Sequence, residues 1–198
     1  SILPSRLHGV WQHRFARDCV RLDANWRKWF REGHEAQFDT ILNRIAKDGP
    51  VGTSDVGAGE TRGKGGWWDW HPSKTALEWL WRTGKLAITR RDGFAKIYDL
   101  TERVIPEAHR ALVPAEEVTD WACRSALQQL GFGTSGEIAA YWKAVGPEAA
   151  KDWCRAALAR GEITEAEVEG ALGQHRKVFI FHEILDEAPP EPTPRLRI

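Results

Sequence analysis

Apolar residues recur at helical spacing in several separate stretches of this 198-residue chain. In residues 14–31 they fall on one face at about 100° per residue, namely Phe15, Cys19, Leu22, Trp26, Trp29 and Phe30. Basic residues fall on roughly the opposite face, namely Arg14, Arg17, Arg21, Lys28 and Arg31. The pattern predicts an amphipathic helix over residues 14–31 with one basic face.

A second group of elements is predicted between residues 36 and 100. Helical spacing runs from Phe38 to Ile45, and "KDGPVG" ends that helix. "TSDV" at residues 53–56 offers a cap and a short helix. A longer helix, "SKTALEWLWRTG", ends at Gly84. Its predicted buried face is Ala76, Leu77, Leu80 and Trp81, and its predicted exposed positions are Lys74, Glu78, Trp79 and Arg82.

The stretch "KLAITRRDGFAKIYDL" then alternates apolar and polar residues around Asp92-Gly93, which is a strong two-residue turn signal. A loop of those two residues would set Ile88 opposite Ile97 and Thr89 opposite Lys96. One face of the hairpin would then be apolar and the other polar. We therefore predict a β-hairpin in this register.

The same order of elements is predicted again after Pro114. "PAEEVTDWACRSALQQLG", "TSGEIAAYW" and "GPEAAKDWCRAALARG" have the features of helices, and "EITEAEVEG" and "RKVFIFHE" those of strands. "LEWLWRTGKLAITR" in the first group parallels "CRAALARGEITEAE" in the second. Each phrase is a helix ending in Arg-x-Gly, followed by a charged and an aliphatic residue, which indicates an internal repeat.

Helices followed by a hairpin, in this order, are typical of a winged helix. The predicted fold is thus mainly α with small β wings (α+β), built as tandem winged helix-turn-helix units preceded by a basic helix. We expect four segments: a basic, Trp-rich helical segment at 1–35, a first winged helix at 36–106, a second at 107–185, and a Pro-rich linker at 186–198.

Composition narrows the class of protein. The chain has three well-separated cysteines without a CxxC pair, which argues for a reducing cytoplasm and against a disulfide framework or zinc module. No apolar run is long enough to cross a membrane. The chain has no methionine, and we expect it to be an interior piece of a longer protein.

Charge is distributed unevenly, although the formal net charge is zero. Residues 1–31 contain seven basic and two acidic side chains, whereas residues 115–190 contain seven basic and thirteen acidic ones. A polyanion would therefore bind the N-terminal part. The pI near 7 counts against an isolated high-affinity nucleic-acid binder.

Winged helices present their third helix and wing to DNA, and the first unit has a basic edge there. The candidate DNA contacts are Arg14, Arg17, Arg21, Arg62, Lys64, Ser73, Lys74, Arg90, Arg91 and Lys96. The arginine face of residues 14–31 could equally be an ordinary solvated surface, and many winged helices bind protein instead. The acidic wing "EITEAEVEG" of the second unit would repel phosphate. That unit is therefore expected to serve as a packing or spacing element rather than to bind DNA.

The stretch "GKGGWWDWHPSK" at residues 63–74 places three tryptophans within four positions. It does not match a phosphate-binding loop, because no lysine-hydroxyl pair follows a strand. Trp67, Trp68 and Trp70 lie too close together to share one helix face, so we expect most of them to be buried as a structural plug. The seven histidines show no metal-ligand spacing, and no metal site is expected.

The segment "KGGWWDWHPSKTALEWLWRTGKLAITRRDGFAKIYDLTERVIP" closely resembles the winged-helix DNA glycosylases that unhook interstrand crosslinks, the YcaQ/AlkZ-like family. The tryptophan cluster, the "RRDGF" wing tip and the "YDLTERV" exit are similar to the family's signature. The resemblance covers the middle portion of a family member, and the final "PRLRI" would lead toward a C-terminal β-barrel.

The resemblance implies a DNA-repair enzyme that hydrolyses the N-glycosidic bond of alkylated or crosslinked purines in double-stranded DNA, without metal or organic cofactor. We expect a cytoplasmic monomer. The family's catalytic Gln-hydrophobic-Gln/Asp motif lies in an earlier winged helix. Gln37 and Asp39 match its letters but head a later helix, where Asp39 is most simply a charge favoured by the helix dipole, so they are rejected as catalytic residues.

Two other functions stay open from the sequence. A tandem winged-helix transcriptional regulator would need side chains that read base edges, and Lys74, Glu78, Trp79 and Arg82 are a poor set for that purpose. A protein-interaction scaffold would bind duplex DNA no worse without Arg90 and Arg91.

Overall fold

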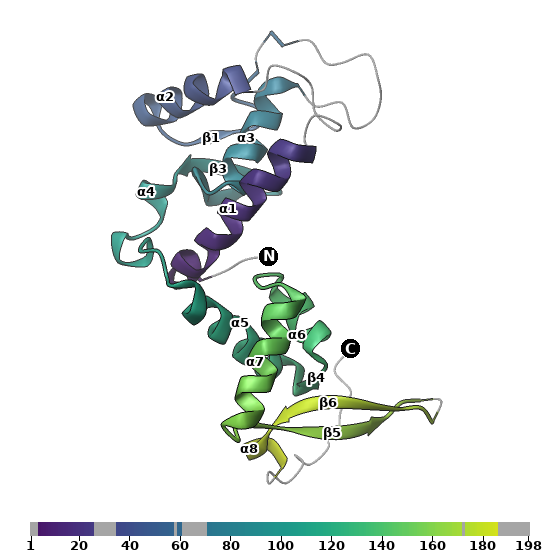
Figure 1. Ribbon diagram of the computed structural model, residues 1–198. Coiled ribbons are helices and arrows are strands. Elements are labelled where there is room, and N and C mark those ends of the chain that lie inside the picture. Colours follow the sequence, from purple (N-terminus) through teal and green to yellow (C-terminus); the bar gives the residue numbers. More distant parts are fainter. Residues whose placement is uncertain (1–3, 26–34, 58, 61–70, 172, 186–198) are drawn as a thin grey trace, which may run out of the picture. The chain divides into compact units, whose positions relative to one another are not determined.

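The computed structural model describes residues 4–25, 35–57, 59–60, 71–171 and 173–185. Contacts within the chain divide it into two compact units, Ser1–Val113 and Pro114–Ile198. Each unit combines helices with one three-stranded antiparallel sheet (Figure 1). The predicted mainly α class with small β wings is confirmed. The predicted boundaries at residues 35/36 and 106/107 stay predictions, and the predicted linker at 186–198 lies outside the described residues.

In the first unit, helices precede and follow the strands of the sheet along the chain. Its elements are η1 (Ser5–Leu7), α1 (His8–Asn25), η3 (Glu35–Gln37), α2 (Phe38–Asp48), β1 (Val51–Gly52), α3 (Pro72–Arg82), β2 (Leu86–Asp92), β3 (Ala95–Leu100), α4 (Thr101–Val104) and η4 (Glu107–His109). The strand order is β1-β3-β2. The buried core comprises Ile41, Ile45, Val51, Val56, Ala76, Leu77, Leu80, Leu86 and Tyr98.

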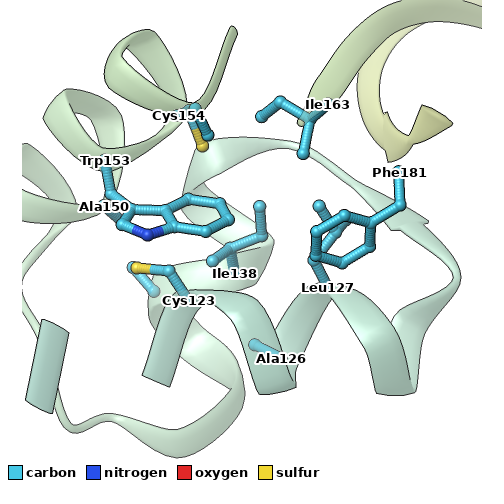
Figure 2. Close-up of a cluster of buried hydrophobic side chains, with 11 residues drawn as sticks. Cys123, Ala126, Leu127, Ile138, Ala150, Trp153, Cys154, Ile163 and Phe181 are labelled. Atoms are coloured by element: carbon cyan, nitrogen blue, oxygen red, sulfur yellow. The ribbon is translucent and has the colours of Figure 1, made fainter. Parts of the chain in front are cut away.

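The second unit repeats this plan. Its elements are α5 (Ala115–Leu130), β4 (Phe132–Gly133), α6 (Ser135–Trp142), α7 (Pro147–Ala159), β5 (Ile163–Glu169), β6 (His175–Phe181) and α8 (His182–Leu185). The strand order is β4-β6-β5. Figure 2 shows the core of this unit, where side chains of α5, α6 and α7 meet Ile163 and Phe181 of the two long strands.

The predicted internal repeat is visible at the junction of the third helix with the wing. Gly84 and Gly161 both adopt left-handed backbone, with φ of 80° and 71°. The following amides, of Lys85 and Glu162, donate to the carbonyls of Leu80 and Ala157 at 2.9 and 3.0 Å. Glycine closes both helices because this conformation is costly for a residue with a Cβ. In both units the next strand begins two residues after the glycine, at Leu86 in β2 and at Ile163 in β5.

Three local features differ from the sequence prediction. Residues 53–56 form a turn rather than a helix, and Asp55 accepts a hydrogen bond from the amide of Gly52 at 2.7 Å. The two-residue strands β1 and β4 were not predicted, because strands this short have no readable alternation. Helix α1 begins at His8 rather than at residue 14, and its predicted continuation beyond residue 25 lies outside the described residues.

The hairpin register differs from the prediction. Asp92 pairs with Ala95, Arg91 with Lys96, Arg90 with Ile97 and Ile88 with Tyr98, with an irregularity at Thr89. The two loop residues are therefore Gly93 and Phe94, not Asp92 and Gly93. Gly93 has φ 61°, as the first central residue of a type II′ turn requires. The prediction placed Asp92 and Gly93 in the loop, with Ile88 opposite Ile97, and that register was wrong.

Helix α1 packs against α3 and also holds the connecting segment after α4. Gln12 Nε2 donates to the Arg110 carbonyl, and His13 Nε2 lies 2.6 Å from the Val113 carbonyl. A side chain at Gly9 would overlap the Ala111 carbonyl, so glycine inside this helix allows the close approach. Residues 107–113 thus pack with the first unit. No helix in the described part of the chain is long and apolar enough to span a bilayer.

The repeat provides a matched test of the α1 packing. A Cβ at Gly84 would lie 2.5 Å from Phe15 Cδ2 of α1, whereas a Cβ at Gly161 would meet nothing within 4 Å. Both alanine substitutions incur left-handed backbone strain of about 1–2 kcal/mol. We expect only Gly84→Ala to displace Phe15 and speed amide hydrogen exchange in α1, measured by mass spectrometry. Equal exchange in α1 for the two variants would contradict this packing.

Candidate nucleic-acid interface

A buried carboxylate joins the third helix of the first unit to its wing. Glu78 of α3 is only 8% exposed, and its Oε1 accepts hydrogen bonds from Lys96 Nζ at 2.8 Å and from Tyr98 Oη at 3.0 Å. Burial and the neighbouring Glu78 charge raise the pKa of Tyr98 well above its ordinary value. The phenol therefore stays protonated and donates. The sequence prediction that Glu78 is exposed was wrong.

Lys96 is held on two sides. Besides its ion pair with Glu78, its ammonium lies 3.8 Å from the centre of the Trp81 ring, and its side chain is 25% exposed. Lys96 and Tyr98 lie two residues apart on β3, so both side chains point to the same face of the sheet. That face is the one that meets α3. The contacts of Lys96 anchor the wing to α3, in addition to any contact with DNA.

The tip of this wing projects charged and aromatic side chains into solvent. Arg90 pairs with Asp92, with Nε and Oδ1 3.2 Å apart and both side chains more than half exposed. Such an exposed pair contributes little to stability, so the guanidinium can exchange this carboxylate for a phosphate at small cost. Arg91 is also exposed, and Phe94 is 101% exposed. The tip offers two guanidinium groups and one bare aromatic ring.

The start of α3 already holds an anion. His71 caps the helix by accepting from the Lys74 amide at 3.2 Å, and Glu60 accepts from the Ser73 amide at 3.0 Å and from the Ser73 hydroxyl at 2.5 Å. Burial alone would raise the pKa of Glu60, but the Ser73 hydrogen bonds and the neighbouring His71 hold it below its ordinary value. Ser73 itself is buried. A phosphate at this helix start would have to displace the Glu60 carboxylate.

The arginines of α1 form a second basic surface. Asp18 lies 3.7 Å from Arg14 and 3.0 Å from Arg21, and the Arg14 guanidinium also lies 5.2 Å from the centre of the Trp11 ring. Arg17 and Arg21 are exposed. One carboxylate is thus shared by two arginines.

Gln37 and Asp39 flank the beginning of α2. Gln37 is the residue before the helix and makes no side-chain capping bond, and Asp39 is exposed in the first turn. Phe38 between them stacks on Trp79 of α3, with ring centres 4.4 Å apart. Trp79 is therefore part of the packing between α2 and α3 rather than an exposed position as predicted.

Several predicted features fall outside the described residues. These are Arg62, Lys64 and the tryptophan cluster of Trp67, Trp68 and Trp70. Among the residues that are described, no group of His, Cys, Asp or Glu has the arrangement of a metal site. The described part of the predicted basic edge is thus the wing tip, the start of α3 and the arginines of α1.

The second wing has a different surface. Glu165, Glu167 and Glu169 are exposed on β5. On the opposite strand Lys177 pairs in register with Glu167, and Arg176 is bound to Glu137 of α6 at 2.6 Å. Glu137 also closes a capping box with Thr134, and these hydrogen bonds hold its pKa at about 2. The basic residues of this wing thus face carboxylates.

Sequence reasoning missed three features: the exposed ring of Phe94, the hydrogen bonds that Glu78 accepts from β3, and the hydrogen bonds that Glu60 accepts from Ser73. Phe94 was assigned to the strand beside the turn, so its side chain was not considered as a tip residue. The signal for Glu78 was present, because Lys96 and Tyr98 share strand parity and a single carboxylate can serve both. No sequence signal linked Glu60 to Ser73, which lies thirteen positions later in the chain.

The role of Glu78 can be tested by truncation. Glu78→Ala would leave the buried Tyr98 hydroxyl and the Lys96 ammonium without their acceptor, so we expect a loss of about 1–3 kcal/mol in the unfolding free energy of the first unit. The control is Asp152→Ala on α7, which removes only an exposed pair with Arg155. Urea unfolding and amide exchange of β3 measure both. Equal losses of unfolding free energy in the two variants would contradict the role of Glu78 in joining α3 to the wing.

The comparison with protein families agrees with the geometry of the first unit. The family model described as "DNA glycosylase AlkZ-like" matches residues 1–198 of this chain. The match therefore includes both winged-helix-like units, the basic wing tip and the α1 arginines. The chain belongs to the AlkZ-like family of DNA glycosylases.

Proposed function

We propose that this chain is the DNA-binding winged-helix portion of a DNA-repair glycosylase that hydrolyses the N-glycosidic bond of alkylated or crosslinked purines. Family membership supplies the reaction class. The observation that carries the DNA-binding assignment is the first wing, where Arg90 and Arg91 project from a hairpin anchored to α3 through Glu78. A rigid basic projection can bind phosphates without first being ordered.

The proposed interface has two parts. Arg90 and Arg91 of the wing bind phosphates directly, and Arg14, Arg17 and Arg21 of α1 provide a second basic surface. Arg62, Lys64 and Lys74 complete the edge predicted from the sequence. Ser73 and Lys96 support this interface through their contacts with Glu60 and Glu78. The acidic strand β5 of the second unit repels phosphate.

The reaction makes modest demands on the part of the protein that holds the duplex. An N-alkylated purine is cationic and therefore a good leaving group. Hydrolysis then needs a positioned water and stabilisation of the developing positive charge on the sugar. We assign these two tasks to residues outside this chain and the binding of the duplex to this chain. We further propose that the protein is a monomer and that it is located in the cytoplasm. The three free cysteines support the second assignment, because a reducing compartment keeps thiols reduced.

Duplex binding tests the interface. Arg90→Ala combined with Arg91→Ala should weaken binding and reduce the slope of log K against log salt by about 1–2, because up to two phosphate contacts are lost. The matched control is Lys151→Ala with Arg155→Ala on the exposed surface of α7. Fluorescence anisotropy over a salt series measures both.

The same titrations separate the other two functions. Unchanged binding in the wing double variant would favour a protein-interaction scaffold and contradict the proposal. Strong preference for one operator among random duplexes would favour a transcriptional regulator and also contradict it. Weak sequence preference with a shallower salt slope in the variant is the expected result.

Base release tests where the chemistry resides. We expect the 198-residue chain to bind a duplex with a single N7-alkylated guanine without releasing the base, measured by strand cleavage at abasic sites. Gln37→Ala and Asp39→Asn should leave duplex affinity unchanged, since both residues belong to the beginning of α2. Base release by the chain that is lost in Asp39→Asn would assign the catalytic role to this motif and overturn our proposal.

A further inference from the structure

The ring of Phe94 is the most exposed large apolar side chain in the described part of the protein. It is 101% exposed, whereas the next two are Val20 at 72% and Leu112 at 63%. Full exposure of a phenylalanine forfeits the free energy that burial of its ring would contribute. The sequence offers no structural reason for phenylalanine at this turn, which accepts small polar residues. A role in binding would explain its presence.

The turn geometry makes the tip narrow and places the ring at its end. Gly93 has no side chain, adopts φ 61°, and would meet nothing within 4 Å if a Cβ were added. Phe94 is the second loop residue, beyond the last strand pair of Asp92 with Ala95. Of the two loop residues, only Phe94 therefore has a side chain.

The base of the same hairpin is held in place. Lys96 and Tyr98 bind Glu78 of α3, and Lys96 also lies against Trp81. These contacts fix β3 from its second residue onward. A ring on a braced hairpin loses less conformational entropy on insertion than one on a free loop.

The spacing of ring and arginines matches the minor groove of DNA. Arg91 precedes the first loop residue by two positions, which is about 7 Å at about 3.4 Å per residue. The minor groove is about 7.5 Å deep. A ring at the floor of this groove would set Arg90 and Arg91 near the phosphates at its rim. The negative potential of a narrow minor groove also attracts arginine.

We propose that Phe94 is an apolar wedge that enters the minor groove of duplex DNA and partly unstacks one base step. Apolar side chains that do so kink the duplex toward the major groove by about 20–90°. This inference rests on the proposed function, because it assumes that the first wing meets DNA. It adds a residue that distorts the helix, whereas the arginines only hold it.

The wedge and the arginines differ in their salt dependence. Phe94→Ala should weaken binding of an undamaged duplex by about tenfold, the effect of losing one stacked base, without changing the slope of log K against log salt. Phe94→Trp should retain affinity, because it keeps an aromatic face. Leu112→Ala, which removes another exposed apolar side chain from the first unit, is the control and should have no effect.

Bending gives an independent readout. On a duplex labelled at both ends, the wild-type chain should raise energy transfer as it bends the DNA, and Phe94→Ala should not. Replacing thymine with uracil throughout should leave these results unchanged, since the thymine methyl group lies in the major groove. A loss of affinity on uracil substitution that requires Phe94 would place the ring in the major groove and overturn the inference.

The outcomes separate this inference from the proposed function. If the chain binds and bends DNA equally well with Phe94→Ala, while Arg90→Ala with Arg91→Ala weakens binding, the wedge is wrong and the interface stands. If the arginine variant also binds as the wild type does, the proposed function fails as well.

Discussion

The contact on which the first unit depends is the buried carboxylate of Glu78. A charge with so little exposure is tolerated only when it is paired and hydrogen-bonded, and Lys96 and Tyr98 meet that requirement. Both donors come from β3, and Glu78 comes from α3. Satisfying one polar group therefore fixes the angle between the third helix and the wing. The position of the wing relative to α3, and so of the side chains at its tip, depends on this contact.

Helix α1 adds a second constraint on the same junction. Phe15 lies against Gly84, where α3 turns into β2, and Gln12 and His13 bind carbonyls of the segment that leaves the first unit. The basic helix is thus both a surface and a structural support. Its arginines and the wing belong to one packed unit, so the DNA contacts proposed for each are supported by the same core.

The two units have the same arrangement of elements but differ in the charge of their wings. Gly84 and Gly161 close the third helices in the same way, and the strand orders correspond. Yet the position of Glu78 corresponds to Arg155, an exposed residue paired with Asp152. The second wing has no such brace at that position, and it carries exposed glutamates. The two units thus share the backbone plan, whereas the charges on their wings differ.

The sequence by itself determined the repeat, most of the longer helices, the two long strands of each wing and the family. These follow from local rules: apolar spacing, glycine after a helix and proline at its start. Only the tertiary structure decided the hairpin register, because the two-residue loop could consist of Asp92-Gly93 or of Gly93-Phe94, and the chain forms the second. It also decided that Ser73 and Lys96 are occupied by carboxylates and that Phe94 is bare. The carboxylate contacts join residues far apart in the chain, such as Glu60 with Ser73 and Glu78 with Lys96, so local spacing alone does not establish them.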